Sequence, residues 1–128
     1  MKKQQALNIV RDYYNSWTNK DFERAGNYLS KNLKVIVPIN NYPTKQSFLD
    51  AVKFTCNMIL KIELLSEFSN ENEAILMYDM SLNGMGKLRI AEYFKIKGNK
   101  IIQVCQIHDT APIRNYNSTV DGISITNK

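Results

Sequence analysis

The stretch LRIAEYFKI, residues 88–96, alternates like a β-strand and carries one carboxylate on its apolar side. Successive side chains of a strand point to opposite faces of a sheet, so residues of one parity share a face. The even set is apolar apart from one member: Leu88, Ile90, Glu92, Phe94 and Ile96. The odd set is mixed and partly charged: Arg89, Ala91, Tyr93 and Lys95. The pattern therefore predicts a strand in which Glu92 faces the core.

Further strand patterns lie on both sides of this stretch. Residues 33–39 are β-branched and alternate, with Pro38 near the end of the strand. Residues 61–68 are expected to bury Ile62, Leu64 and Phe68, and residues 74–82 to place Leu76, Tyr78, Met80 and Leu82 on one face. Gly98-Asn99 is a hairpin signal, and it precedes a last strand with Ile102, Val104, Gln106 and His108 on one face. Together these segments predict a largely antiparallel sheet.

Three segments before residue 60 have the apolar spacing of helices. The first, residues 4–21, places Ala6, Val10, Tyr13 and Trp17 on one stripe. Asp21 is the expected N-cap of a short second helix, and Thr44 is that of a third helix. The predicted fold class is α+β, with three N-terminal helices on one side of a curved, mostly antiparallel sheet. A cavity between helices and sheet would be the place for a small molecule.

The domain organisation follows from the chain length and from where the apolar periodicity ends. The 128 residues are 44% hydrophobic and 23% charged, which is ordinary for one globular domain. We expect the domain to cover residues 1–110. Beyond Pro112 the chain is polar and aperiodic, so residues 111–128 are expected to form a loosely ordered tail.

Composition also excludes several classes of function. The net charge is +5, but the lysines are scattered singly, so we expect no nucleic-acid partner. No apolar run is long enough to span a bilayer, and we expect a cytoplasmic protein without a membrane partner. Two cysteines are too few for a disulfide framework. Cys105 and His108 have an odd spacing that separates them on a strand, and with a single histidine we expect no metal and no cofactor.

The order of these elements resembles the nuclear transport factor 2-like superfamily, in particular its SnoaL-like and ketosteroid isomerase-like branches. The likeness covers residues 4–110, and the ending KIIQVCQIHD, residues 100–109, is similar to the closing strand of those proteins. The resemblance implies a cone-shaped fold with a pocket, and a homodimer formed through the outer face of the sheet.

The resemblance to the steroid isomerases implies roles for individual residues. Tyr13 matches the oxyanion-hole tyrosine of the first helix, and Glu92 matches the protonated aspartate that is the second donor. The position of the general base is Val37, followed by a retained Pro38. Valine cannot transfer a proton, so the isomerase mechanism cannot run here in its family form. His108, the only histidine, is the candidate that could replace the base.

Two hypotheses follow for the function. In the first, the chain binds a small hydrophobic molecule carrying an oxygen function, which Tyr13 and a neutral Glu92 hold by hydrogen bonds, with His108 near the mouth. Catalysis, if present, would be proton transfer next to a carbonyl, as in isomerisation, cyclisation or dehydration. The expected pocket lining is Trp17, Val37, Tyr78, Met80, Phe94, Val104 and Gln106.

In the second hypothesis the chain is a non-catalytic, homodimeric partner-binding module whose cavity is filled by its own side chains. Each candidate residue also has a structural alternative. Glu92 could serve only the fold by pairing with a buried tyrosine or amide, and Tyr13 could be ordinary core. His108 could be half-exposed and hydrogen-bonded to Asp109 or to the C-terminal tail.

Overall fold

A computed structural model describes residues 2–121 of the chain and the side chains of residues 5–117. The elements follow one another in this order: α1 (Lys2–Thr18), α2 (Phe22–Asn27), β1 (Leu29–Ile36), α3 (Lys45–Cys56), β2 (Ile59–Ser69), β3 (Glu73–Leu82), β4 (Gly86–Lys97), β5 (Lys100–Ile107) and α4 (Ala111–Asp121). Three helices before a meander of strands were predicted, and this α+β organisation is confirmed.

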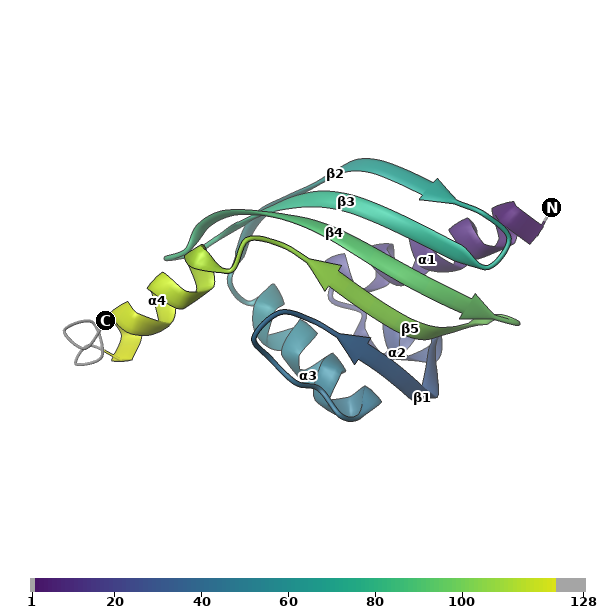
Figure 1. Cartoon of the computed structure of the whole chain (residues 1–128), viewed down its shortest axis with the longest axis horizontal. Helices are drawn as coiled ribbons and strands as arrows, with labels where there is room; N and C mark the ends of the chain where they lie inside the picture. The colour runs from purple at the N-terminus through teal and green to yellow at the C-terminus, as the bar shows by residue number, and fades with distance from the viewer. Residues whose placement is uncertain (1, 122–128) are drawn as a thin grey trace.

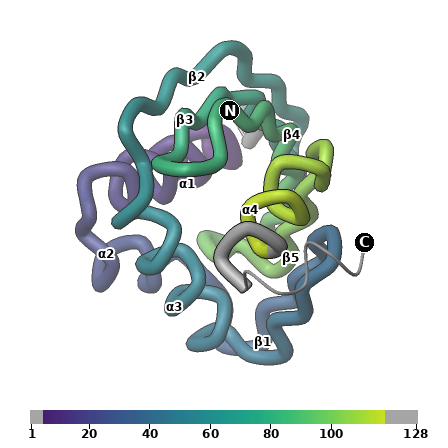
Figure 2. Tube along the Cα trace, turned by 90° about the vertical axis from the view of Figure 1, so that its left-hand side faces the viewer, coloured from purple at the N-terminus to yellow at the C-terminus, as the bar shows by residue number. Residues whose placement is uncertain are grey.

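The strands form one curved sheet in the order β1-β5-β4-β3-β2. The pairs β2–β3, β3–β4 and β4–β5 are antiparallel, and β1 joins β5 in parallel. Helices α1, α2 and α3 lie against one face of the sheet, whereas α4 extends from the end of β5 (Figure 1). Viewed from the end that carries α4, the strands curve around one side and α1–α3 close the other (Figure 2).

Helix α1 covers the sheet with the stripe that its spacing predicts. Its buried side chains are Ala6, Ile9, Val10, Tyr13, Tyr14, Ser16 and Trp17. The predicted caps are confirmed as well. The Asp21 carboxylate accepts a hydrogen bond from the Arg24 amide, and Thr44 and Ser47 form a reciprocal capping box at the start of α3.

Strand β4 has the two faces that its sequence predicts. Leu88, Ile90, Phe94 and Ile96 are buried on the side of the helices, and Glu92 on the same face is only 1% exposed. The odd residues face outward, and Tyr93 stands directly opposite Ile75 and Cys105 on the two neighbouring strands. The prediction that Glu92 faces the core is therefore confirmed.

Strand β2 corrects one prediction. Ile62 keeps its inward position opposite Met80, but Leu64 is 38% exposed and Phe68 is 67% exposed. The pairing with β3 shifts between Leu64 and Ser66, and the extra residue reverses the faces of everything after it. In addition, β2 is an edge strand, so no further strand covers its free side.

A similar irregularity affects β5. Its register against β4 shifts between Lys95 and Ile96, so Ile101 is fully buried, whereas Ile102, which was expected to face inward, is half-buried. Val104 and Gln106 keep the predicted face, since they stand opposite Phe94 and Glu92. His108 follows the end of the strand.

Strand β1 begins and ends earlier than expected, at Leu29 and Ile36 instead of 33 and 39. Ile39 has φ of 57°, a left-handed conformation that a β-branched residue rarely adopts and that no strand continues through. The segment from Val37 to Tyr42 therefore forms a loop between β1 and α3.

The C-terminal segment differs from the expected loose tail. Residues 111–121 form helix α4, and residues 122–128 lie outside the described part of the chain. The Asp109 carboxylate accepts from the Ala111 amide at 3.0 Å, and Pro112 falls in the first turn, where a missing amide is tolerated. Ile113 packs against the core, and the Tyr116 ring lies so close to Gly84 that a Cβ there would meet it at 2.9 Å. These two apolar contacts, three residues apart, hold a helix whose composition is otherwise polar.

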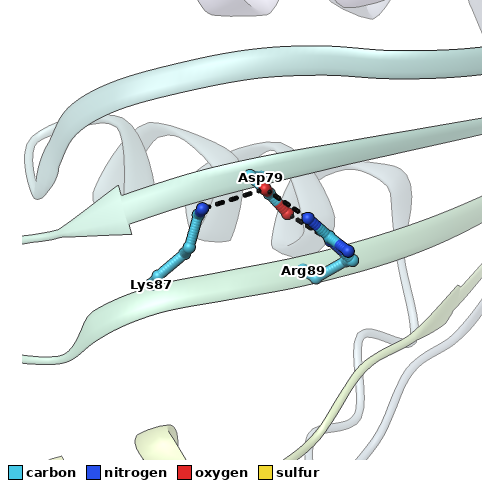
Figure 3. A network of polar contacts seen from close by, with 3 residues as sticks. All are labelled: Asp79, Lys87 and Arg89. Atoms are coloured by element: carbon cyan, nitrogen blue, oxygen red, sulfur yellow. Dashed lines mark hydrogen bonds and ion pairs between the residues drawn. The ribbon is translucent and has the colours of Figure 1, made fainter.

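A network of charges lies on the outer face of the sheet. Arg89 binds the Asp79 carboxylate through Nε at 2.7 Å and Nη2 at 2.9 Å, and Lys87 approaches it at 3.3 Å (Figure 3). The two long side chains cover Asp79, which is 5% exposed. The hydrogen bonds from Arg89 lower the pKa of Asp79 to about 2.

This network predicts a specific acid dependence of stability. Because the folded state holds the Asp79 pKa at about 2, below the ordinary value of 3.8, the stabilisation is complete above pH 4 and disappears as the pH falls toward 2. Urea denaturation should give Asp79→Asn a clearly lower free energy of unfolding than the wild type at pH 6, and the difference should narrow below pH 4 and close only as the pH falls below about 2. A gap that does not change with pH would contradict the assignment.

Candidate functional site

A pocket of about 460 Å³ lies between the inner face of the sheet and the helices. Its lining comes from α1, the loop after β1, α3, strands β3 and β4, the end of β5, and α4. Eight of the predicted site residues line this one pocket: Tyr13, Trp17, Val37, Tyr78, Met80, Glu92, Gln106 and His108. The structure thus brings together most of the residues that the sequence singled out.

Two predicted lining residues are not part of the pocket, and here the prediction is wrong. Phe94 and Val104 are fully buried and stand opposite each other, one inward-facing row beyond Glu92 and Gln106. In that row Phe94 meets the edge of the Tyr13 ring, with centroids 5.8 Å apart. This packing closes the pocket, so Glu92 and Gln106 form its floor.

Glu92 is held by two side chains from the neighbouring strands. The Tyr78 hydroxyl donates to Oε1 and the Gln106 amide donates to Oε2, both at 2.9 Å. Burial raises the pKa of Glu92, and the two hydrogen bonds oppose that rise. Each carboxyl oxygen has a second lone pair, so the group can make further contacts with a molecule in the pocket.

Tyr13 presents an unused hydroxyl group at the same floor. The residue is 1% exposed and lines the pocket, and its hydroxyl has no hydrogen-bond partner among the side chains of residues 5–117. Burial, followed by the nearby Glu92, raises the pKa of Tyr13 well above its ordinary value, so the phenol remains protonated. A protonated phenol without a partner is a hydrogen-bond donor available to a ligand.

Aromatic rings surround this polar floor. Trp17 and Tyr78 line the pocket with ring centroids 6.1 Å apart, and Tyr14 packs behind them at 5.6 Å from Trp17 and 5.5 Å from Tyr78. Burial, and then Glu92, raises the pKa of Tyr14 to about 12. The site therefore offers flat apolar surfaces next to a few polar atoms, as small-molecule sites generally do.

His108 lines the pocket as a half-buried residue after the end of β5. Its Nδ1 lies 3.1 Å from the backbone carbonyl oxygen of Asp109. Because a carbonyl oxygen can only accept, Nδ1 is the donor in this contact, and in the tautomer with its proton on Nδ1 the other ring nitrogen, Nε2, is an acceptor. His108 thus combines both alternatives, a bond to Asp109 and a place in the pocket.

Val37 and Pro38 both line the pocket. The position at which the resemblance places a general base is therefore at the site but holds a side chain that cannot accept a proton.

Comparison with solved structures identifies the architecture. No protein-family model matches the sequence, and no curated protein matches it. A protein from Kribbella flavida superposes with a TM-score of 0.83 at 22% identity, covering 91% of this chain and 97% of its own. An NTF2-like protein of unknown function from Cytophaga hutchinsonii superposes with a TM-score of 0.73 at 14% identity, covering 85% and 94%. The chain has the NTF2-like fold.

A third structure with this fold is a proposed ketosteroid isomerase, also from Kribbella flavida. It has a TM-score of 0.73 and 11% identity, and the match covers 87% of this chain and 82% of that one. At these identities the similarity establishes the NTF2-like fold, and the chemistry has to be argued from the pocket itself.

Several pocket residues were not expected from the sequence. Phe48 and Val52 are apolar residues four positions apart on α3, so the helical spacing of the sequence contained that signal. Met85 lies in the turn between β3 and β4, and Ile113 and Tyr116 come from α4. Their contribution depends on the turn and on the unexpected helix meeting at the pocket, which local patterns do not show.

Among the side chains that the structure describes, no group of three or more His, Cys, Asp and Glu residues is arranged to hold a metal ion. Among residues 2–121, none of the helices combines the length and apolar character needed to cross a bilayer.

Proposed function

We propose that the chain binds a small hydrophobic molecule carrying an oxygen function, with that oxygen accepting a hydrogen bond from Tyr13. The observation that carries this proposal is the Tyr13 side chain, which is buried as a whole and lines the pocket, and whose hydroxyl has no hydrogen-bond partner among the described side chains. A protonated hydroxyl that lines the pocket without a protein partner is free to donate a hydrogen bond to an acceptor on a ligand. The rest of the lining is largely apolar and aromatic.

The hypothesis of a partner-binding module with a filled cavity has less support. Side chains from the helices and the sheet leave a pocket of about 460 Å³, which lies within the size range of ligand sites. Catalysis remains a separate proposal. His108 is the residue that would accept a proton beside a substrate carbonyl, because Val37 cannot.

Removing the Tyr13 hydroxyl tests the binding proposal. A thermal-shift screen of polycyclic ketones, phenols and lactones should identify compounds that stabilise the wild type. For these compounds Tyr13→Phe should weaken binding by roughly 3- to 10-fold, the effect of one neutral hydrogen bond. Titration calorimetry measures the change.

Tyr14→Phe is the matched control, because Tyr14 is equally aromatic and buried but does not line the pocket. It should leave affinity unchanged. If no compound shifts the melting temperature of the wild type, or if the two variants behave alike, the role of Tyr13 is wrong.

We also propose that two copies pair through the outer face of the sheet. One row of outward side chains crosses all five strands: Phe68, Ile75, Tyr93, Cys105 and Ile36. The adjacent row includes Met77, Ala91 and Ile107. Phe68 and Ile107 are 67% and 65% exposed, and contiguous apolar surface of this kind is typical of interaction sites.

Polar rows flank this apolar band on both sides. On one side are Glu73, Lys95 and Gln103, and on the other are Glu63, Asp79 and Arg89. An apolar centre with a charged rim is the usual organisation of a protein interface, and a two-fold axis would let each copy present the same band to the other.

A further inference from the structure

The pocket differs in charge from the rest of the chain. The protein carries 17 Lys and Arg residues against 12 Asp and Glu. None of the described residues that line the pocket is Lys or Arg, whereas one of them is the carboxyl group of Glu92. The lining of the site therefore contains one carboxyl group and no lysine or arginine, although the protein as a whole is basic.

Glu92 also lacks a counter-ion within the described part of the chain. The ion pairs there join Arg11 to Glu67, and Lys87 and Arg89 to Asp79. Glu92 is 1% exposed and is satisfied only by the neutral donors Tyr78 and Gln106. Fully buried carboxyl groups in proteins are normally paired with a cation, so this arrangement is incomplete.

The surroundings of Glu92 are suited to a cation. Tyr13, Trp17 and Tyr78 line the same pocket, and π-faces attract ammonium groups, most strongly in desolvated sites. Both hydrogen bonds at Glu92 run toward the carboxyl oxygens, which favours the ionised, accepting form. A bound ammonium group would provide the charge that the protein does not supply.

We propose that the pocket selects a hydrophobic amine, whose protonated nitrogen lies against Glu92 while aromatic rings enclose its carbon skeleton. This inference rests on the proposed function and narrows it to ligands with a basic nitrogen near the polar end. It also predicts rejection of carboxylates and phosphates, since an anion would face Glu92 without a lysine or arginine in the described lining.

A matched set of ligands with one carbon skeleton tests this proposal. The probes are 1-adamantylmethylamine, 1-adamantanemethanol and 1-adamantanecarboxylate, which are cationic, neutral and anionic at pH 7.5. Trp17, the single tryptophan of the chain, lines the pocket and reports occupancy by its fluorescence, because the probes do not absorb in its range. The amine should bind about tenfold more tightly than the alcohol, and the carboxylate should not bind measurably.

Glu92→Gln removes the charge but keeps two polar atoms for the hydrogen bonds to Tyr78 and Gln106. The Gln106 amide can rotate so that its oxygen accepts from the new side-chain NH2 group. In this variant the advantage of the amine over the alcohol should disappear, with the affinity of the alcohol retained. Tyr13→Phe is the complementary control, and it should weaken the alcohol without removing the preference for charge.

The wild-type comparison alone can overturn the inference, so it does not depend on the folding of any variant. If the alcohol binds and the amine binds no more tightly, charge selection is wrong while the proposed binding function stands. That outcome would favour a neutral, hydrogen-bond-donating Glu92. If none of the three probes binds, the proposed function is contradicted together with this inference.

Discussion

Ile75→Asp is expected to convert the proposed homodimer into a monomer. Ile75 lies near the middle of the apolar band on the outer face, between Phe68 and Tyr93 of the neighbouring strands. In a two-fold interface the substitution would bury two carboxylates without partners, at a cost of several kcal/mol. We expect the dimer dissociation constant to rise by at least about 100-fold, since each 1.4 kcal/mol is a factor of ten.

Sedimentation equilibrium measures this change directly, and for the proposed dimer the expected wild-type mass is twice the chain mass of 14.8 kDa. Leu60→Asp is the matched control. Leu60 is 72% exposed on β2 but lies outside the two apolar rows, so this variant should remain dimeric. A monomeric wild type at tens of micromolar would refute the proposed interface, and so would an unaltered mass for Ile75→Asp.

Phe94→Ala should cause the largest loss of stability from a single residue. Phe94 is fully buried on the inner face of β4, opposite Ala74 and Val104, and packs edge-on against Tyr13. Removing a buried phenylalanine ring costs about 3–5 kcal/mol, because both the transferred apolar surface and the packing around it are lost. Urea denaturation at one fixed protein concentration measures this, since dimerisation would otherwise shift the midpoint.

The comparison residue for this experiment is Phe54. Its side chain is 67% exposed on α3, so Phe54→Ala should cost less than about 1 kcal/mol. A loss below about 2 kcal/mol for Phe94→Ala would mean that the surrounding residues collapse into the space, and that the pocket floor is less rigid than the packing indicates.

The fold could be predicted because its signals are local and repeated. The alternation of residues 88–96 identified the inward face of β4 and so the buried position of Glu92. The apolar stripe of α1 and the caps Asp21 and Thr44 defined helices that the structure confirms. In each case several neighbouring residues carry the same information, so one atypical residue does not change the prediction.

The errors have a different physical origin. The bulge after Leu64 exposes Phe68, and a bulge is one extra residue in a pairing that sequence alternation does not reveal. Helix α4 depends on contacts of Ile113 and Tyr116 with distant residues. In the site, the shared face of Tyr78, Glu92 and Gln106 followed from parity, but the two hydrogen bonds at Glu92 depend on strand order and register. That Phe94 closes the pocket likewise depends on how α1 lies across the sheet.

The parallel pairing of β1 with β5 constrains the order of events as the polypeptide leaves the ribosome. Among the strands of the described chain, β1 is paired only with β5, and α3, β2, β3 and β4 are all synthesised between the two. Until then β1 remains without a strand partner, and closing so long a loop is slow compared with forming local hairpins. The pocket, whose rim follows β1 and whose floor includes a residue of β5, would therefore be among the last features to form.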